Sequence, residues 1–249
     1  MKEISNASSA ANASVPCAEP MTSKATETAT KQPLFVLKSQ SLGWGQKTVL
    51  DALDLTINAG EKVAIVGKSG EGKSTLIHTL YQQHPESIAY CSQAYGLVPS
   101  LSIYHNIYMG QLDQHSFVYN LINLLRPIKS QVCKITPLAK ALGLQEDLFR
   151  PAESLSGGQQ QRTALARTLF HNRAIFIGDE PISSVDEVQS EQILSLIMSR
   201  HHTTILTLHN VDLALRFCNR IIGIRHGKIE LDCATKDLSG SQLRSLYQD

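Results

Sequence analysis

The sequence of 249 residues has no apolar run of about 18 residues, so none of its segments is predicted to span a bilayer as a helix. Its 5 cysteines are scattered and form no CxxC pair, which argues against a disulfide framework or a zinc site and favours plain thiols in a reducing compartment. Charge is also balanced, with 23 Lys and Arg against 22 Asp and Glu. We therefore expect no nucleic-acid partner, since such proteins usually carry a basic surface.

The start of the chain lacks the apolar core of a signal peptide. Residues 1–32 are rich in Ser, Ala, Thr and Asn. They cannot bury enough apolar surface to fold, so they are predicted to be a disordered tail. A targeting or regulatory arm is the alternative interpretation.

From residue 33 to residue 249, short strands alternate with helical stretches. This alternation predicts an α/β fold with a mostly parallel sheet covered by helices on both faces. The apolar alternations at Leu34–Leu37 and Thr48–Ile57 predict an antiparallel pair of strands in front of that sheet. Residues from about 100 to 165 are mainly helical, with an apolar pattern at Phe117, Leu121, Leu124 and Leu125, and are interpreted as an inserted helical subdomain.

One stretch matches GxxxxGK[ST], the phosphate-binding P-loop. It follows the predicted strand Lys62–Val66 and precedes the amphipathic stretch Ser74–Gln83, which makes a mere glycine-rich turn a poor interpretation. Glycines let backbone N–H groups wrap phosphate oxygens closely, the lysine adds a positive charge, and the Ser74 hydroxyl can bind Mg²⁺. The residues expected to bind the nucleotide here are Gly67, Lys68, Ser69, Gly70, Glu71, Gly72, Lys73, Ser74 and Thr75.

A second feature is a pair of adjacent carboxylates, Asp179 and Glu180, after the predicted strand Ala174–Ile177. Successive strand residues point to opposite sides, so the two can serve different tasks. Asp179 suits the Mg²⁺ shell, and Glu180 suits orienting or deprotonating a water. Alone the pair is a weak signal, but beside a P-loop it indicates nucleotide hydrolysis.

A third feature is a serine followed by glycines at the start of the predicted helix Gly157–His171. Exposed amides at a helix N-terminus form an anion site, here built from Ser156, Gly157, Gly158 and Gln159. An ordinary N-capped helix, with Ser156 as its cap, is the alternative.

The order of these features resembles the ABC ATPase family. Leu155–Gln159 reads LSGGQ and lies between a P-loop and a strand that ends in Asp-Glu, as the family's signature does. The resemblance implies a P-loop NTPase core with an N-terminal antiparallel β subdomain and an inserted helical subdomain. It also implies ATP and Mg²⁺ as cofactors and Lys73, Glu180 and His209 as catalytic residues.

Four further positions match the family's pattern. Gln93 resembles the Q-loop glutamine of the Mg²⁺ shell, and Asp186 the acidic residue of the D-loop. His209 resembles the switch histidine near the γ-phosphate. Trp44 stands where the family places an aromatic ring on adenine, although a packing role for this sole tryptophan is the alternative. His201 and His202 match no motif and are interpreted as a solvated helix end.

The resemblance also implies partners. ABC ATPases act as head-to-tail dimers, in which the signature of one copy covers the ATP held by the P-loop of the other. They serve separate membrane permeases and, indirectly, a substrate-binding protein. We therefore expect a peripheral protein on the cytoplasmic face of the inner (plasma) membrane. The permease is expected to dock around residues 93–104 and on the helical block.

One departure concerns the segment between Lys73 and Gln93, which are only 20 positions apart. The family usually has antiparallel strands there, and these must be shortened in this chain.

Substrate choice rests on weaker signals. Residues 96–102, 106–112 and 211–218 resemble ATPase subunits of phosphonate importers. Import of a phosphonate or related oxyanion is therefore the favoured interpretation. The alternatives are an exporter or lipoprotein-release ATPase, an importer for another solute, a non-transport ABC protein and a nucleotide-binding scaffold without turnover.

Overall fold

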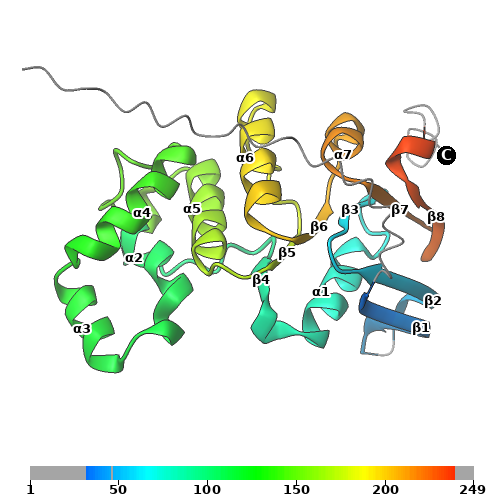
Figure 1. Ribbon diagram of the computed structural model, residues 1–249, viewed down its shortest axis with the longest axis horizontal. Coiled ribbons are helices and arrows are strands. Elements are labelled where there is room, and N and C mark those ends of the chain that lie inside the picture. The colour runs from blue at the N-terminus through cyan, green and yellow to red at the C-terminus, as the bar shows by residue number, and fades with distance from the viewer. Residues whose placement is uncertain (1–31, 46, 239–249) are drawn as a thin grey trace, which may run out of the picture. The chain divides into compact units, whose positions relative to one another are not determined.

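In the residues that the computed structural model describes, 32–45 and 47–238, six strands form one sheet (Figure 1). The strands are β3 (Lys62–Val66), β4 (Ile88–Cys91), β5 (Ile175–Gly178), β6 (Thr203–Thr207), β7 (Arg220–Arg225) and β8 (Lys228–Ala234). Their order is β4-β5-β6-β3-β7-β8; all neighbours are parallel except β7 and β8, which form an antiparallel hairpin. The predicted parallel sheet is confirmed. The predicted tail, residues 1–32, lies outside the described residues except for its last position.

The predicted antiparallel pair is also confirmed, and it is longer than the apolar alternations indicated. β1 (Pro33–Trp44) pairs with β2 (Lys47–Asn58) along its whole length. Polar positions such as Lys38 and Asp54 alternate with buried Leu37 and Leu53, so both strands bury one face only.

Helices connect the parallel strands, and several of these connections also contain a 3-10 turn. The helices are α1 (Lys73–Gln83), α2 (Ile103–Tyr108), α3 (Phe117–Leu125), α4 (Lys129–Ala141), α5 (Gly157–Phe170), α6 (Glu187–Arg200) and α7 (Val211–Phe217). The 3-10 turns are Pro85–Ser87, Met109–Gln114, Ala152–Ser154 and Thr235–Asp237. No helix in the described part of the chain combines the length and apolarity that a membrane crossing needs.

Alternation along the buried strands divides the interior into two cores. In β3, Ala64 and Val66 face a core shared with α2, α4, α5, α6 and α7. Val63 and Ile65 face the opposite core, which is completed by α1 and by the β1–β2 pair. Figure 1 shows α5, α6 and α7 on one side of the sheet and α1 with β1 and β2 on the other.

The connection from α1 to β4 is short, as the spacing of Lys73 and Gln93 predicts. Across these fully described residues the chain passes from α1 through the single turn Pro85–Ser87 into β4. β4 pairs in parallel with β5, so this stretch adds no antiparallel strand to β1 and β2.

Helix α3 places its apolar residues outward. An apolar helical stripe normally faces a core, but Phe117 and Leu125 are each 79% exposed and Leu121 is 44% exposed. Within α3, all of which is described, only Asn123 is buried. Its Oδ1 accepts hydrogen bonds from the Tyr104 hydroxyl (2.7 Å) and from the amide of Ile128 (2.9 Å), so a polar side chain anchors this apolar helix.

The interpretation of His201 as part of a solvated helix end is wrong. Its side chain is buried between β5 and the end of α6, with Nδ1 2.7 Å from the carbonyl of Arg173 and its ring against Phe176. Burial lowers its pKa, which favours the neutral ring. His202 is exposed, as predicted.

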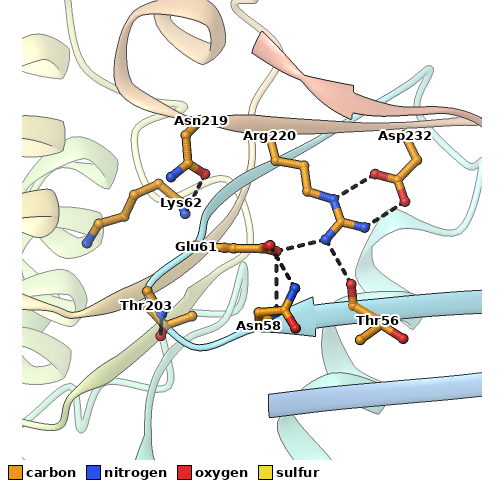
Figure 2. A network of polar contacts seen from close by, with 9 residues as sticks. Thr56, Asn58, Glu61, Lys62, Thr203, Asn219, Arg220 and Asp232 are labelled. Carbon is orange, nitrogen blue, oxygen red and sulfur yellow. Dashed lines mark hydrogen bonds and ion pairs between the residues drawn. The ribbon is translucent and has the colours of Figure 1, made fainter. Parts of the chain in front are cut away.

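A polar network around Arg220 joins the two sheets (Figure 2). At the start of β7, its guanidinium binds Asp232 of β8 through two hydrogen bonds of 2.7 Å. It also donates to the Thr56 carbonyl of β2 at 2.8 Å and to Glu61 at 2.7 Å. Burial raises the pKa of Glu61, but hydrogen bonds from Asn58 and Arg220 outweigh it and hold the pKa below its ordinary value of 4.5.

Replacing Arg220 by methionine should destabilise the fold by roughly 2–3 kcal/mol, because it leaves the largely buried Glu61 carboxylate without its charged partner. A lowered folded-state pKa contributes stability above the ordinary pKa and loses it as pH falls through the lowered value. The difference from wild type should therefore shrink below pH 4.5. Urea unfolding at neutral and acidic pH measures both effects. The control Arg216→Met removes a more exposed pair with Glu191 and should cost under about 1 kcal/mol; equal losses in the two variants would contradict the role of the network.

Candidate active site

The carboxyl ends of four neighbouring parallel strands bring the predicted site residues to one edge of the sheet. The P-loop follows β3, Gln93 follows β4, Asp179 and Glu180 follow β5, and His209 follows β6. This edge is where open α/β sheets bind ligands. The strand order β4-β5-β6-β3 makes these loops neighbours although the sequence separates them widely.

Glycines shape the P-loop as the sequence predicts. Gly67, Gly70 and Gly72 have φ values of 149°, 86° and 97°, which L side chains rarely adopt. A Cβ at Gly67 would also lie 2.4 Å from the carbonyl oxygen of Ile224. Within the loop, Ser69, Gly70 and Ser74 are exposed, whereas Gly67, Lys73 and Thr75 are buried. The Glu71 carboxylate accepts a 3.3 Å hydrogen bond from the amide of Gly227, which places it at the β7–β8 turn.

Lys73 begins α1 and turns its ammonium group back over the loop. Nζ donates to the carbonyls of Gly67 and Lys68, each at 2.8 Å. Burial lowers the pKa of Lys73, and the charges of Glu180 and Asp179 oppose that shift. The lysine therefore lies in the field of the two carboxylates that the sequence assigns to the same site.

Glu180 and His209 contact each other across the ends of β5 and β6. His209 Nε2 lies 2.5 Å from Glu180 Oε1; since a carboxylate can only accept, the imidazole N–H donates. The backbone of Glu180 has φ 52°, a left-handed conformation that costs a non-glycine residue about 1–2 kcal/mol. Asp179, which is 5% exposed, accepts a 2.8 Å hydrogen bond from the Thr207 hydroxyl.

Gln93 lines a small cavity with the carboxylates. The cavity, of about 90 Å³, is bordered by Gln93, Asp179 and Glu180, with Gln161 of α5 completing it. The structure thus brings the Q-loop candidate to the acidic pair. Its oxygen-rich lining includes two side-chain amides and two carboxylates.

The signature residues form a fully capped helix start. The Ser156 hydroxyl accepts a hydrogen bond from the backbone N–H of Gln159 (3.3 Å), and the side-chain oxygen of Gln159 accepts one from the backbone N–H of Ser156 (3.0 Å). This capping box fits the alternative interpretation, in which Ser156 is the N-cap of an ordinary helix. Gly157, the next residue, is exposed. A Cβ at Gly158 would lie 3.1 Å from the Ser184 carbonyl oxygen, so the start of α5 packs closely on the segment just before Asp186.

Two further predicted site residues lie at the ends of secondary-structure elements. Asp186 is the N-cap of α6, and its Oδ1 accepts a hydrogen bond from the backbone N–H of Gln189 at 2.9 Å. Trp44 ends β1, and its stacking on adenine remains a prediction.

Sequence reasoning missed two polar side chains that contact Asp179, Glu180 or the residues just after them. Thr207 lies in β6 and is fully buried, and Gln161 lies in α5 and is 4% exposed. Gln161 Nε2 donates to the Glu180 carbonyl (2.9 Å) and to the Ser183 hydroxyl (3.0 Å), while its oxygen accepts from the Ser184 amide (3.0 Å). A threonine at the carboxyl end of a buried apolar strand was the available signal for Thr207.

The two helix N-termini that could bind anions belong to opposite sides of the sheet. α1, which follows the P-loop, packs in one core, and α5, which follows Ser156, packs in the other. This arrangement argues against both loops of one chain enclosing the same phosphate group.

Comparisons with known proteins show the family of this chain. The family model described as ABC transporter matches residues 50–183, more than half of the chain. A phosphonates import ATP-binding protein, PhnC, from Rhizobium etli is 32% identical over 86% of both chains. The PhnC protein of Caulobacter vibrioides is 28% identical over 88% of this chain and 94% of its own.

Solved structures show the same fold. A dimeric bacterial ABC transporter cassette covers 80% of this chain and 98% of its own, with a TM-score of 0.67 and 24% identity. A cassette in a post-hydrolysis dimer bound to ADP and Pi has a TM-score of 0.64 over the same shares. The chain therefore belongs to the ABC transporter family, as one of its ATP-binding and ATP-hydrolysing members.

Proposed function

We propose that this protein is the ATPase subunit of an importer for phosphonate or a related oxyanion. The observation that carries the ATPase site is the Glu180–His209 contact beside the P-loop lysine. The substrate rests on the relatives, which are named as phosphonate importer subunits at 28–33% identity. Residues 33–249 would form the ABC ATPase domain, with about 100–165 as its helical subdomain.

The P-loop would hold the phosphates of ATP. Its positive-φ glycines expose backbone N–H groups, and Lys73 supplies a cation at the β- and γ-phosphates. Glu180 would accept a proton from the attacking water as the γ-phosphoryl bond to ADP breaks, giving ADP and phosphate. His209 would fix the carboxylate of Glu180 through its Nε2–H and lie near the γ-phosphate.

The residues at this edge fit Mg²⁺ by their donor chemistry. The hydroxyl of Ser74, the carboxylate of Asp179 and the side-chain oxygen of Gln93 are hard oxygen donors, which Mg²⁺ prefers alongside phosphate and water. When bound, the ion would neutralise phosphate charge. Asp179 also accepts a hydrogen bond from the Thr207 hydroxyl.

A second copy of the chain would complete each site. Because α1 and α5 lie on opposite sides of the sheet, Ser156, Gly157, Gly158 and Gln159 would meet the ATP of a partner copy in a head-to-tail dimer. Asp186 would lie at the same interface, as would Ser183 and Ser184, which hydrogen-bond to Gln161 of α5.

The apolar surface of α3 would receive the permease. Phe117, Leu121 and Leu124 line a groove of about 360 Å³ together with Leu101 and Tyr108 of the preceding segment. Exposed apolar surface of this kind marks protein-binding sites. Docking there would hold the chain peripherally on the cytoplasmic face of the membrane, with a substrate-binding protein acting on the permease.

Glu180→Gln should lower kcat for ATP hydrolysis roughly 100-fold or more, because the amide cannot accept the water's proton. The KM for ATP should change little, since the P-loop is untouched. Steady-state phosphate release measures both constants. Equal turnover by wild type and variant would contradict the role of Glu180.

Mixing two inactive variants tests the dimer. Lys73→Ala removes the P-loop cation, and Ser156→Glu introduces a charge that repels phosphate at the signature. In a head-to-tail dimer the mixture regains one intact site in each heterodimer, so turnover should recover to about a quarter of wild type. No recovery, with heterodimers verified by pull-down of differently tagged chains, would contradict a site shared between copies.

Growth on a phosphonate as sole phosphorus source tests both substrate and docking. Loss of the gene should abolish growth, and the double variant Phe117→Ser, Leu121→Ser should not restore it, because the permease loses its apolar contact. The same variant should keep wild-type turnover in solution, and the control Val36→Ser, which alters an exposed apolar residue of β1, should restore growth.

Different outcomes of this experiment contradict the proposed substrate and the proposed docking surface. Undiminished growth without the gene would contradict the substrate, whereas rescue by the double variant would contradict the docking surface.

A further inference from the structure

Strand β6 carries three buried threonines in a setting that otherwise calls for apolar side chains. Thr203, Thr204 and Thr207 are each at most 1% exposed. A buried hydroxyl is costly unless it is hydrogen-bonded, so each needs a partner. At the start of the strand, Thr203 accepts the amide of Gly60 at 2.9 Å, one of the contacts near the Arg220 network in Figure 2. At the opposite end of the strand, Thr207 hydrogen-bonds to Asp179 and Glu180.

The hydrogen bonds of Thr207 have one possible direction. The amide of Glu180 can only donate, and it lies 2.7 Å from the Thr207 oxygen. The single proton of the hydroxyl is therefore free for the Asp179 carboxylate, 2.8 Å away. One buried hydroxyl thus orders both acidic residues, the backbone of one and the side chain of the other.

The register of the sheet produces this contact. β5 and β6 pair Gly178 with Leu206 at their last ladder position, so the next residues along, Asp179 and Thr207, come side by side. Thr207 also pairs with Ile65 of β3, the strand that leads into the P-loop. Thr207 therefore lies between β3 and the residue that follows β5.

The Glu180 peptide is held from both sides. Its N–H donates to Thr207, and its carbonyl accepts the side-chain amide of Gln161 at 2.9 Å. Between these anchors the residue has φ 52°. Such a conformation persists only where the surroundings over-determine it, and here it directs the carboxylate to His209.

We propose that Thr207 is a positioning residue for ATP hydrolysis, acting through Glu180. Sheet formation does not require a hydroxyl here, since valine is equally β-branched and similar in shape. The hydroxyl is needed to hold the Glu180 peptide in the orientation that aims its carboxylate. This inference rests on the proposed role of Glu180 as the base.

Thr207→Val should lower kcat about 10-fold, because a misaimed base loses proximity to its water. The KM for ATP should stay within about twofold, since the P-loop contacts remain. Thr207→Ser should recover most of the lost turnover. The matched control Thr203→Val removes a hydroxyl from the other end of the same strand and should leave kcat unchanged even if its Tm falls as far.

A second comparison guards against a valine variant that does not fold. Thr207→Ser and Thr207→Ala both lack the methyl group and differ only in the hydroxyl, so serine should turn over faster by the same factor. Far-ultraviolet circular dichroism and Tm establish that each variant is folded.

Three outcomes overturn the inference. The first is an unchanged kcat in Thr207→Val, whether or not its KM rises. The second is an equal kcat in the serine and alanine variants, and the third is an equal fall of kcat in Thr203→Val. If Glu180→Gln itself keeps wild-type turnover, the proposed base fails and this inference fails with it. A dead Glu180→Gln beside a fully active Thr207→Val overturns the positioning role alone.

Discussion

The parallel register of β3, β5 and β6 is the constraint on which the site depends. Pairing of Ile65 with Thr207, and of Gly178 with Leu206, ends these strands at the same level. Loops that are distant in the sequence therefore meet at one edge, where their polar groups bind one another and leave water-accessible atoms for a nucleotide. A slip of one residue between β5 and β6 would turn Thr207 away from Asp179 and expose a buried carboxylate.

Two cores make this register rigid. Alternating residues of β3 feed both sides of the sheet, so a shift of the strand would disturb α1 and α5 together. Arg220 adds a polar tie between β2, β7 and β8 at the other edge (Figure 2). The edge that carries the P-loop, by contrast, holds a left-handed Glu180 and a half-exposed His209, so the less favourable geometry lies where the chemistry is proposed to take place.

Much of the fold could be predicted because local signals agreed with each other. The P-loop and the strand Lys62–Val66 follow from glycine placement and hydrophobic period, and the structure has the strand at the predicted bounds. His201 could not be placed, because the carbonyl of Arg173 that binds it comes from a distant segment. The periodicity of α3 indicated a helix but not which way it faces, since exposure depends on neighbours that the pattern does not reveal.

The site followed a similar rule. Motifs gave the residues that are proposed to face the ligand, because phosphate chemistry demands particular side chains at fixed spacing. Thr207 and Gln161 escaped notice because only the tertiary structure brings their partners to them, and these partners include the peptide groups of Glu180. Motif residues thus identify the reaction, while their supports become visible only in the fold.

The outward-facing apolar residues of α3 have a consequence for the life of the protein in the cell. Newly made copies that have not met a partner display Phe117 and Leu125 in the manner of an incompletely folded chain. Quality-control proteases and chaperones read such surfaces, so surplus copies would be removed while assembled ones are spared. The abundance of this protein would then be set by the number of its docking places rather than by its own rate of synthesis.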